Sequence, residues 1–425
     1  MEIAFYREFA PTSFLSTTSI FERLSHEIWT YYAITKVVEE VLKTHDAALA
    51  NRPIVLAIEV MCYGNSGIVF APYGDCWRQM RKICVSKLLS AKRVQSFSRI
   101  REEVVNNLVE SISLSEGVPI NLSEKIFLST YCTAFRAAIG KKCKYEKEFI
   151  SLIKEMFTLG GAFDLPDFFP SLKFLGFLTG IKPALLKTHR NTDKILNDII
   201  NDHKKKRSSI SAKKSEESDN DDMIDVLLKL QETGDLGFNV TSNHIKAVTL
   251  EVFFAGSETS ATTIERAMSE LIKNPRVMEK AQAEVRQVLE GQRNFDEADI
   301  QKLDYMKLVV KETLRLHPPG PLITREAREK CEINGFQDSL IDFKGSNFGF
   351  IPFGGGRRIC PGISFALANI ELVLSRLLYH FNWKLPNEIK PKELDMSESF
   401  GISCRRKSDL YLIATPLKPL LHERH

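Results

Sequence analysis

The chain has 425 residues, of which 44% are hydrophobic and 26% charged, and its formal net charge is +4 at pH 7. This apolar fraction excludes a wholly disordered chain, and 22 glycines with 17 prolines exclude a collagen-like or low-complexity chain. A small basic excess spread over a large surface does not indicate a nucleic-acid partner, and none is expected. At roughly 150 residues per domain, the length allows two or three domains or one large one.

The cysteines and the N-terminus restrict the cellular setting. None of the eight cysteines forms a C-x-x-C pair, so a structural zinc site is not expected, and their scatter favours a reducing compartment. The first twenty residues contain Glu2, Arg7 and Glu8 and have no apolar run of signal-peptide or membrane-span length. No later stretch is long and apolar enough either, so the chain as written is predicted to be soluble.

The hydrophobic pattern is mostly helical. Apolar residues recur every three or four positions over residues 78–112, with a break near Ser90, and again over residues 184–206. Residues 204–222 contain no large apolar residue except Ile210. They predict a charged, solvated linker between two helical blocks.

A long helix is predicted from Thr241 to Lys273, ending at Asn274-Pro275. Roughly 30 residues at 1.5 Å each would span about 45 Å, the width of a whole domain. Its first half, AVTLEVFFAG, is apolar on almost every side, which predicts a central, buried helix. The pattern as a whole predicts a mainly α fold with small β-sheets (α+β). Further helices are predicted at 275–291, 297–316 and 364–381, and short strands at 330–335 and 409–415.

The segment most specific for chemistry is FGGGRRICPG, from Phe353 to Gly362. Three consecutive glycines allow a tight backbone that can lie close against a flat ligand. Cys360 stands just before a predicted helix, where the helix dipole together with Arg357 and Arg358 favours the thiolate. One thiolate cannot build a zinc or iron–sulfur site alone, but it can be the single axial ligand of a haem iron. For Cys360 considered alone, a buried cysteine beside a glycine turn is the simpler interpretation.

A second segment, AGSETS from Ala255 to Ser260, interrupts the apolar face of the long helix. Glycine and hydroxyl residues loosen a helical turn and can leave room for water or a small ligand. An acid next to an alcohol, here Glu258 and Thr259, can relay protons towards a bound diatomic molecule. Small residues that merely permit close helix packing are an equally good interpretation of this segment alone. The presence of Cys360 favours the proton relay.

Two pairs of residues have the spacing of interacting side chains. Glu312 and Arg315 are three apart on one helical face, where they can form an ion pair. Trp77 and Arg81 lie one turn apart, and both can donate hydrogen bonds to a carboxylate. The first pattern is common by chance, and the second is also typical of an ordinary surface helix.

Together these segments resemble the cytochrome P450 superfamily, and within it the plant A-type group that includes many terpenoid and alkaloid hydroxylases. The segment from Phe353 to Gly362 matches the haem-ligand signature F-x-x-G-x-R-x-C-x-G, for which a chance match is on the order of one in ten thousand. AGSETS resembles the oxygen-activation motif A-G-x-[DE]-T-[ST], and LHPPGPL follows the Glu312–Arg315 pair as in plant members. The resemblance covers roughly residues 36–417.

The resemblance implies the cytochrome P450 fold, as a single large haem-binding domain over residues 36–425. The implied cofactor is haem b (iron protoporphyrin IX), with Cys360 as the protein ligand of the iron. The resemblance assigns oxygen activation to Gly256, Glu258 and Thr259, and a structural ion pair to Glu312 and Arg315. It assigns further haem contacts to Phe353, Gly356, Arg358, Gly362, Trp77, Arg81 and Arg325. It places substrate contacts in the ranges 54–70, 159–168, 247–259, 319–324 and 398–402, and among them at Ala255, Phe400, Gly401 and Ile402.

The sequence departs from the family in two places. Residues 1–35 match neither the membrane anchor nor the basic patch nor the Pro-rich hinge of the family, which leaves at most peripheral membrane contact. After Phe336 the chain jumps to Gln337 and omits the family's P-E-R-F motif, whose arginine completes a buried network with Glu312 and Arg315. Breaking such a network typically costs about 3–5 kcal/mol. We hypothesise a skipped exon or an error in the gene model, which a contiguous transcript across this junction would contradict.

The implied activity is that of a haem-thiolate monooxygenase, which inserts one oxygen atom of O2 into a small lipophilic, terpenoid-like substrate. Electrons would come from NADPH through NADPH–cytochrome P450 reductase, docked on a basic face that contains Arg78, Arg81, Lys82 and Arg357. The expected state is a monomer at the cytosolic face of the endoplasmic reticulum membrane. One alternative is a catalytically impaired or haem-poor truncated relative that acts as a binding protein or is only a splice product. A branch that rearranges peroxides without a reductase is another alternative, which Thr259 argues against.

Overall fold

The computed structural model describes residues 38–53, 56–140, 143–160, 180–209, 221–234, 238–290, 296–322, 324–328, 350–399 and 401–417. The chain divides into two compact units. The smaller unit combines Met1–Leu49 with Ala327–Ile359, and the larger unit combines Ala50–Glu326 with Cys360–His425. The division therefore falls between Ile359 and Cys360, inside the segment that resembles the haem-ligand signature.

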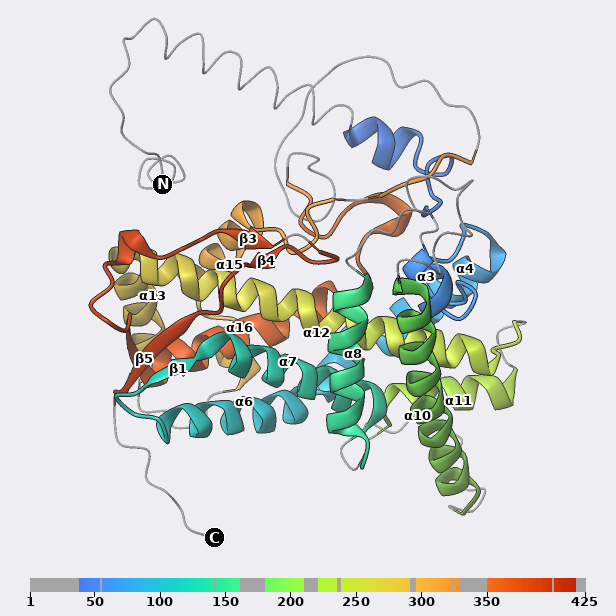
Figure 1. Ribbon diagram of the computed structural model, residues 1–425, viewed down its shortest axis with the longest axis horizontal. Helices are drawn as coiled ribbons and strands as arrows, with labels where there is room; N and C mark the ends of the chain where they lie inside the picture. Colours follow the sequence, from blue (N-terminus) through green and yellow to red (C-terminus); the bar gives the residue numbers. More distant parts are fainter. Residues whose placement is uncertain are drawn as a thin grey trace, which may run out of the picture. The chain divides into compact units, whose positions relative to one another are not determined.

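The larger unit is built mainly from helices, as the hydrophobic pattern predicts (Figure 1). Its described helices are α3 (Leu56–Met61), α4 (Asp75–Ile83), η2 (Cys84–Leu88), α5 (Ala91–Ser96), α6 (Ser98–Ser113), α7 (Leu122–Ile139), α8 (Glu146–Gly160), α10 (Ile181–Ser209), α11 (Met223–Thr233), α12 (Ser242–Lys273), α13 (Pro275–Val288), α14 (Glu297–Ile300), α15 (Asp304–Leu316), α16 (Ile363–His380) and the short turn η5 (Pro391–Glu393).

Helix α12 is the long central helix predicted from the sequence, and its bounds match the prediction. At its start, the Thr241 side chain accepts a hydrogen bond from the N–H of His244, and the His244 ring accepts one from the N–H of Thr241. The helix ends at Asn274, where Pro275 begins α13. It packs against α7, α15 and α16 and is buried along most of its length (Figure 1).

The other predicted helices are present with shifted ends. The break near Ser90 is confirmed, because the Ser90 side chain accepts a hydrogen bond from Arg93 N at the start of α5. Helix α10 continues through residues 204–209, which were predicted as linker, and basic residues in a last helical turn suit the helix dipole. The predicted 297–316 helix divides into α14 and α15, because the Glu284 carboxylate accepts hydrogen bonds from the backbone N–H groups of Tyr305 and Met306, where α15 begins.

The β-structure of the larger unit is small, as predicted. Strands β1 (Pro119–Asn121), β5 (Tyr411–Pro416) and β2 (Phe381–Lys384) form an antiparallel sheet in the order β1-β5-β2. Strands β3 (Glu398–Ser399) and β4 (Arg405–Arg406) form a short antiparallel hairpin. The predicted strand at 409–415 corresponds to β5, whereas the one predicted at 330–335 lies outside the described residues.

Aromatic and aliphatic side chains around α12 form the core of the larger unit. The ring of Phe253 on α12 lies 5.1 Å from Phe149 on α8 and 6.2 Å from Phe135 on α7. All three rings are fully buried, so they fix how these helices pack around α12.

In the smaller unit, the described helical turns are η1 (Glu40–Thr44) and η4 (Gly356–Arg358). None of the described helices has the length and apolarity to cross a bilayer.

Candidate functional site

Cys360 lies just before α16, whose N-cap is Gly362. The position before a helix N-terminus, predicted from the sequence, is confirmed. The sulfur of Cys360 accepts a hydrogen bond from the N–H of Gly362 at 3.4 Å. Burial raises the pKa of the thiol, while this hydrogen bond and the charge of Arg81 act in the opposite direction and favour the thiolate.

Helix α12 has one open face, over Ala255 and Thr259. The two residues are four apart and therefore lie on the same side of the helix. Ala255 is exposed and Thr259 half-buried, whereas most of the helix is buried. A Cβ atom on Gly256 would lie 3.4 Å from the ring of Phe365, so this glycine brings α12 close to α16, the helix that follows Cys360. The predicted site residues thus lie on α12 and just before α16, two helices that pack together.

The hydroxyl group of Thr259 donates to the carbonyl oxygen of Ala255 at 2.6 Å. A hydroxyl oxygen that donates its proton in this way keeps two lone pairs, with which it can accept a hydrogen bond. Thr259 is therefore suited to hold the proton of a small ligand or of water at the open face.

Glu258, predicted to act with Thr259, turns to another side of α12. Its carboxylate accepts hydrogen bonds from the Tyr131 hydroxyl at 2.6 Å and the Ser403 hydroxyl at 3.3 Å, and Arg405 lies 3.8 Å away. Burial raises the pKa of Glu258, although Tyr131 and Arg405 favour its charged form. These side chains line a hollow of about 720 Å³ between α7, α8, α12 and the β3–β4 hairpin. The structure therefore does not bring the acid and the alcohol together.

Trp77 and Arg81 lie one turn apart on α4. The Trp77 indole is 3% exposed, and the Arg81 guanidinium lies 5.5 Å from the centre of its ring. The Trp77 Nε1–H donates to the carbonyl oxygen of Ile68 at 2.9 Å. The charge of Arg81 acts to lower the pKa of Cys360, which suits a cation beside a thiolate. The donation by Trp77 to a haem carboxylate stays a prediction.

Arg325 belongs to a second cationic group, with Arg52 as its neighbour. The Arg52 guanidinium donates to the carbonyl oxygen of Thr324. Burial, together with the charge of Arg325, lowers the pKa of Arg52 to about 10. Two guanidinium groups this close favour an anion beside them, which suits the predicted role of Arg325 as a carboxylate donor.

In the smaller unit, the glycine-rich loop has a shape that only glycine tolerates. Gly354 and Gly356 have φ values of +71° and +67°. A Cβ atom on Gly356 would overlap the carboxylate of Asp46, which is 3% exposed and accepts hydrogen bonds from the backbone N and Nη1 of Arg357 at 2.7 and 3.2 Å. The glycines and this buried acid together fix the loop. Of the predicted haem contacts in this unit, Phe353 is half-buried, Gly356 is exposed and Arg358 is 8% exposed.

The predicted ion pair on α15 is confirmed. Arg315 donates to both carboxylate oxygens of Glu312, at 2.7 and 2.8 Å. The two side chains are 42% and 25% exposed, respectively, so the pair lies near the surface of this structure.

Of the predicted substrate contacts, Gly401 and Ile402 are exposed in the turn between β3 and β4, and Phe400 lies outside the described residues.

These residues suit a haem in three respects. In the part of the chain that the structure describes, Cys360 belongs to no group of ligating side chains that could hold a metal ion by themselves. One thiolate with no second protein ligand fits an iron whose remaining ligands are not side chains. The cations Arg81, Arg52 and Arg325 fit carboxylates such as the haem propionates, and the open face of α12 provides space for a ligand.

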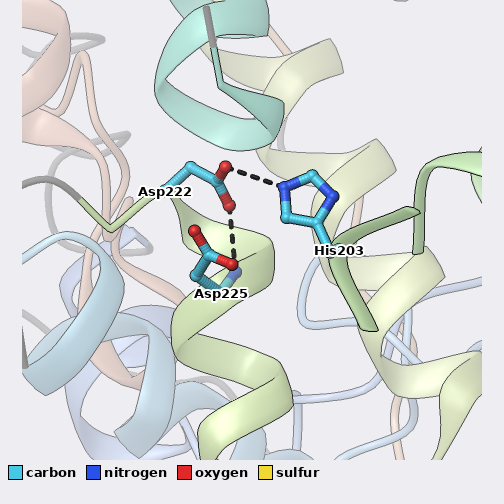
Figure 2. Close-up of side chains that lie close together, drawn as sticks. All are labelled: His203, Asp222 and Asp225. Carbon is cyan, nitrogen blue, oxygen red and sulfur yellow. Dashed lines mark hydrogen bonds and ion pairs between the residues drawn. The ribbon is translucent and has the colours of Figure 1, made fainter. Parts of the chain in front are cut away.

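One group of side chains has the composition of a metal centre, and it lies on α10 and at the start of α11 (Figure 2). Ligand atoms of His203, Asp222 and Asp225 lie within 4.8 Å of one another. Both ring nitrogens of His203 face acceptors, the Ile199 carbonyl at 2.9 Å and the Asp222 carboxylate at 2.9 Å, as in a charged imidazolium. Asp222 also accepts from Asp225 N as the N-cap of α11. An ion pair and a helix cap therefore account for this group without a metal.

This ion pair makes the stability of the protein depend on pH. Burial opposes the charge on His203, but its hydrogen bond to Asp222 and the charge of Asp222 raise its pKa to about 9. The stabilisation is therefore complete below the unfolded pKa of about 6.5 and is lost as the pH rises through 9. Between these values, urea titrations should show the free energy of unfolding of the wild type falling by about 2 kcal/mol relative to His203→Gln. Parallel pH profiles of the two proteins would contradict this.

Sequence reasoning missed several residues that shape the site. Asp46, Arg52 and Tyr131 act through partners far away in the chain, so no local spacing marks them. Asp46 was marked only weakly, as an isolated acid before the stretch ALANRP, and Arg52 only as the arginine within that stretch. For Tyr131 there was no local signal, because it is one of several polar residues along α7.

Comparison with known proteins identifies what the chain resembles. A family model described as Cytochrome P450 matches residues 22–341 and 336–413. The first of these ranges begins before residue 36, where the resemblance seen in the sequence starts. The two ranges meet at the Phe336–Gln337 junction and overlap there by a few residues.

Relatives in plants and solved structures agree with this match. A melianol synthase of Ailanthus altissima is 52% identical over 413 residues, which are 89% of this chain and 80% of that protein. A premnaspirodiene oxygenase of Hyoscyamus muticus is 48% identical over 417 residues, which are 90% of this chain and 83% of that protein. A solved structure of a zebra fish cytochrome P450 with progesterone is 22% identical and matches with a TM-score of 0.74. The match covers 90% of this chain and 92% of the zebra fish chain, which shows that the two share a fold.

Proposed function

The chain belongs to the cytochrome P450 family, whose members bind haem, and from this premise we propose that it is a monooxygenase of small lipophilic, terpenoid-like compounds. The haem, when bound, supplies the activation of O2 and the oxygen-atom transfer. The observation that carries the proposal is the placement of Cys360 before α16, directly beside α12 with its open face over Ala255 and Thr259. Cys360 would hold the iron through its sulfur, with the Gly362 N–H and Arg81 favouring the thiolate.

Two residues of α12 would divide the handling of protons. Thr259 would accept and return a proton at its Oγ1, because its acceptor positions remain available while it donates to Ala255. Glu258 would exchange protons with water in the neighbouring hollow, because burial raises the pKa of its carboxyl group and so favours the protonated form. Tyr131 would orient Glu258 through the 2.6 Å hydrogen bond.

The proposed substrate class is supported by the relatives and by the site. The plant relatives of about 50% identity include a melianol synthase and a premnaspirodiene oxygenase, names that point to terpenoid oxidation. On this chain the open face of α12 is flanked by apolar residues, including Phe254 and Val252, which suit a lipophilic molecule. The exposed Ile402, in the β3–β4 turn, would contact such a substrate as well.

The proposed electron donor is NADPH, through a partner reductase. The exposed cations Arg78 and Lys82 on α4 would attract an acidic flavoprotein towards the helix that carries Arg81. The proposed location is the endoplasmic reticulum membrane, as expected for the family. Because the matching relatives carry the names of enzymes, the alternative of a non-enzymatic binding protein has no support.

We also propose that a segment is missing between Phe336 and Gln337. The family match divides into two ranges at this junction, which supports the hypothesis. Residues 329–349 lie outside the described residues.

Replacing Thr259 with alanine should uncouple NADPH oxidation from product formation. Without Oγ1, the open face lacks the group that accepts and returns the proton, so the amount of product per NADPH oxidised should fall roughly tenfold or more. The measurement uses the holoenzyme with reductase and a sesquiterpene or triterpene substrate, and quantifies product and NADPH together.

Ser260→Ala is the matched control, because it removes a hydroxyl from the next residue, which is buried on another side of α12. It should leave coupling unchanged, and Thr259→Ser should restore most of it. Unchanged product per NADPH in Thr259→Ala would show that this hydroxyl has no role in proton delivery.

A further inference from the structure

The C-terminal turn of α10 is a strongly cationic part of the larger unit. Residues 204–206 are three consecutive exposed lysines, and Arg207 follows them. Cations stabilise the last turn of a helix, where the helix dipole is negative. Two exposed serines, Ser208 and Ser209, then end α10. Two hydroxyl groups therefore stand directly after four cations, in a turn that the proposed monooxygenase chemistry does not use.

Both serine side chains turn back onto their own helix. The Ser208 hydroxyl donates to the carbonyl oxygen of Lys205, and the Ser209 hydroxyl donates to that of Lys206, each at 2.8 Å. The last turn of a helix frays readily, because its carbonyl groups have no partners further along the helix. Since both serines are exposed, opening this turn breaks few contacts. Ser209 can therefore leave the helix and enter the groove of another protein as extended chain.

The end of α10 holds α11 at both of its ends. His203 and Arg207 are four residues apart and therefore lie on the same side of α10. His203 bonds to Asp222 at the start of α11 (Figure 2), and Arg207 donates from Nη2 to Glu232 in its last turn at 2.6 Å. The Arg207 side chain is 21% exposed and that of Glu232 is 57% exposed. An ion pair this open to water contributes little, so a stronger anion nearby can compete for Arg207.

We propose that Ser209 is a phosphorylation site for a serine kinase with an acidic substrate groove, and that its phosphate takes Arg207 from Glu232 and so releases the C-terminal end of α11 from α10. Lys206 and Arg207 stand three and two residues before Ser209, where such a groove would bind cations. This inference goes beyond the proposed monooxygenase function and does not depend on it.

The phosphoryl group comes from ATP. A bond forms between the Ser209 Oγ atom and the γ-phosphorus, and the bond from that phosphorus to the bridging oxygen breaks. ADP leaves, and the hydroxyl proton passes to the catalytic base of the kinase.

The phosphate changes the balance at the end of α10 in two ways. It carries a charge of about −1.5 to −2, which the negative end of the helix dipole disfavours, and Ser209 loses the proton that it donates to the Lys206 carbonyl. The last turn is therefore expected to unwind. Once unwound, the chain can bring the phosphate to the guanidinium of Arg207, and an arginine–phosphate pair is bidentate and strong. Glu232, with a single charge and an exposed side chain, is the weaker competitor.

The first measurement locates the phosphate. The full chain is incubated with ATP, Mg²⁺ and the catalytic subunit of the cyclic-AMP-dependent protein kinase, which selects cations at these two positions, and modified residues are identified by mass spectrometry. Phosphate should appear on Ser209, and Ser209→Ala should lower its total incorporation roughly tenfold or more. Lys206→Glu should lower it similarly, because it reverses a charge that the groove binds. Lys194→Glu is the matched control at another exposed lysine of α10 and should leave the incorporation unchanged.

Ser96 provides a further control within the wild-type chain, because Arg93 also precedes it by three residues. The Arg93 side chain is 7% exposed, and the Ser96 hydroxyl donates to the Arg93 carbonyl at 2.8 Å within α5. Ser96 should therefore carry no phosphate while Ser209 is modified, which separates an accessible site from a sequence pattern alone. Phosphate on Ser96 but not on Ser209, or none on Ser209 after prolonged incubation, would overturn the inference.

The second measurement is hydrogen exchange by mass spectrometry, which tests the release of α11 and needs no turnover. Peptides that cover residues 229–233 should exchange roughly two- to fivefold faster in the phosphorylated chain than in the unmodified chain. Glu232→Gln removes the ion pair without a phosphate, so it should reproduce this acceleration, and phosphorylating it should add little more. Unchanged exchange in the phosphorylated wild type would overturn the proposed release. An equal further acceleration in phosphorylated Glu232→Gln would also overturn it, because the phosphate would then not act through Arg207.

Discussion

Replacing Glu297 with glutamine is expected to lower the free energy of unfolding by about 3 kcal/mol. Glu297, at the start of α14, accepts hydrogen bonds from Arg101 of α6 at 2.5 and 2.8 Å. The Arg101 side chain is completely buried, and its other described hydrogen bond goes to the Val94 carbonyl at 2.9 Å. Removing the negative partner leaves a buried guanidinium without its counter-charge, which costs far more than an exposed pair contributes.

Glu103→Gln provides the matched control for this prediction. Glu103 accepts from Arg99 on the same helix at 3.3 Å, but Arg99 is 84% exposed, so this change should alter the free energy of unfolding by less than about 0.5 kcal/mol. Urea unfolding followed by circular dichroism measures both variants. Similar losses in the two would mean that burial does not determine the contribution of the Arg101–Glu297 pair.

Replacing Cys360 with alanine should abolish product formation, with a loss of roughly a thousandfold or more. In the part of the chain that the structure describes, Cys360 belongs to no group of ligating side chains, and the described hydrogen bond to its sulfur comes from Gly362 N. The fold should therefore survive the change, and the thermal midpoint of the apoprotein should stay close to that of the wild type.

The assay compares product formation by Cys360→Ala with that of Cys132→Ala, which removes a half-buried thiol from α7. The second variant should keep most of the activity. Product formation by Cys360→Ala at more than a small fraction of the wild-type rate would remove Cys360 from the proposed chemistry.

The elements that the sequence predicts best are those whose signals are local. The bounds of α12 follow from a capping residue, Thr241, and a helix stop, Asn274-Pro275, that lie next to the helix itself. The end of α10 was misplaced, because basic residues without apolar neighbours resemble a linker although they also suit the last turn of a helix. The division of 297–316 depends on Glu284, a residue outside that stretch, so the periodicity of the stretch cannot show it.

The same distinction applies to the candidate site. Cys360 could be predicted because the glycines, arginines and following helix are all within a few residues of it. The orientation of Glu258 could not, because its partners Tyr131 and Ser403 are 127 and 145 residues away. The carboxylate of Glu251 likewise bonds to the amides of Ile68 and Val69, which are 183 and 182 positions before it in the sequence. Long-range contacts of this kind are fixed by the packing of α12 against its neighbours.

The central claim is that Cys360 holds a haem iron as its thiolate ligand, and the absorption spectrum of the reduced protein with carbon monoxide tests it most directly. The full chain is expressed with a haem supply, reduced and exposed to carbon monoxide, beside Cys360→Ser as the reference. A Soret band displaced far towards longer wavelength in the wild type, and absent from Cys360→Ser, is the predicted result. A protein that takes up no haem, or a Soret band that is the same in both proteins, would contradict the claim.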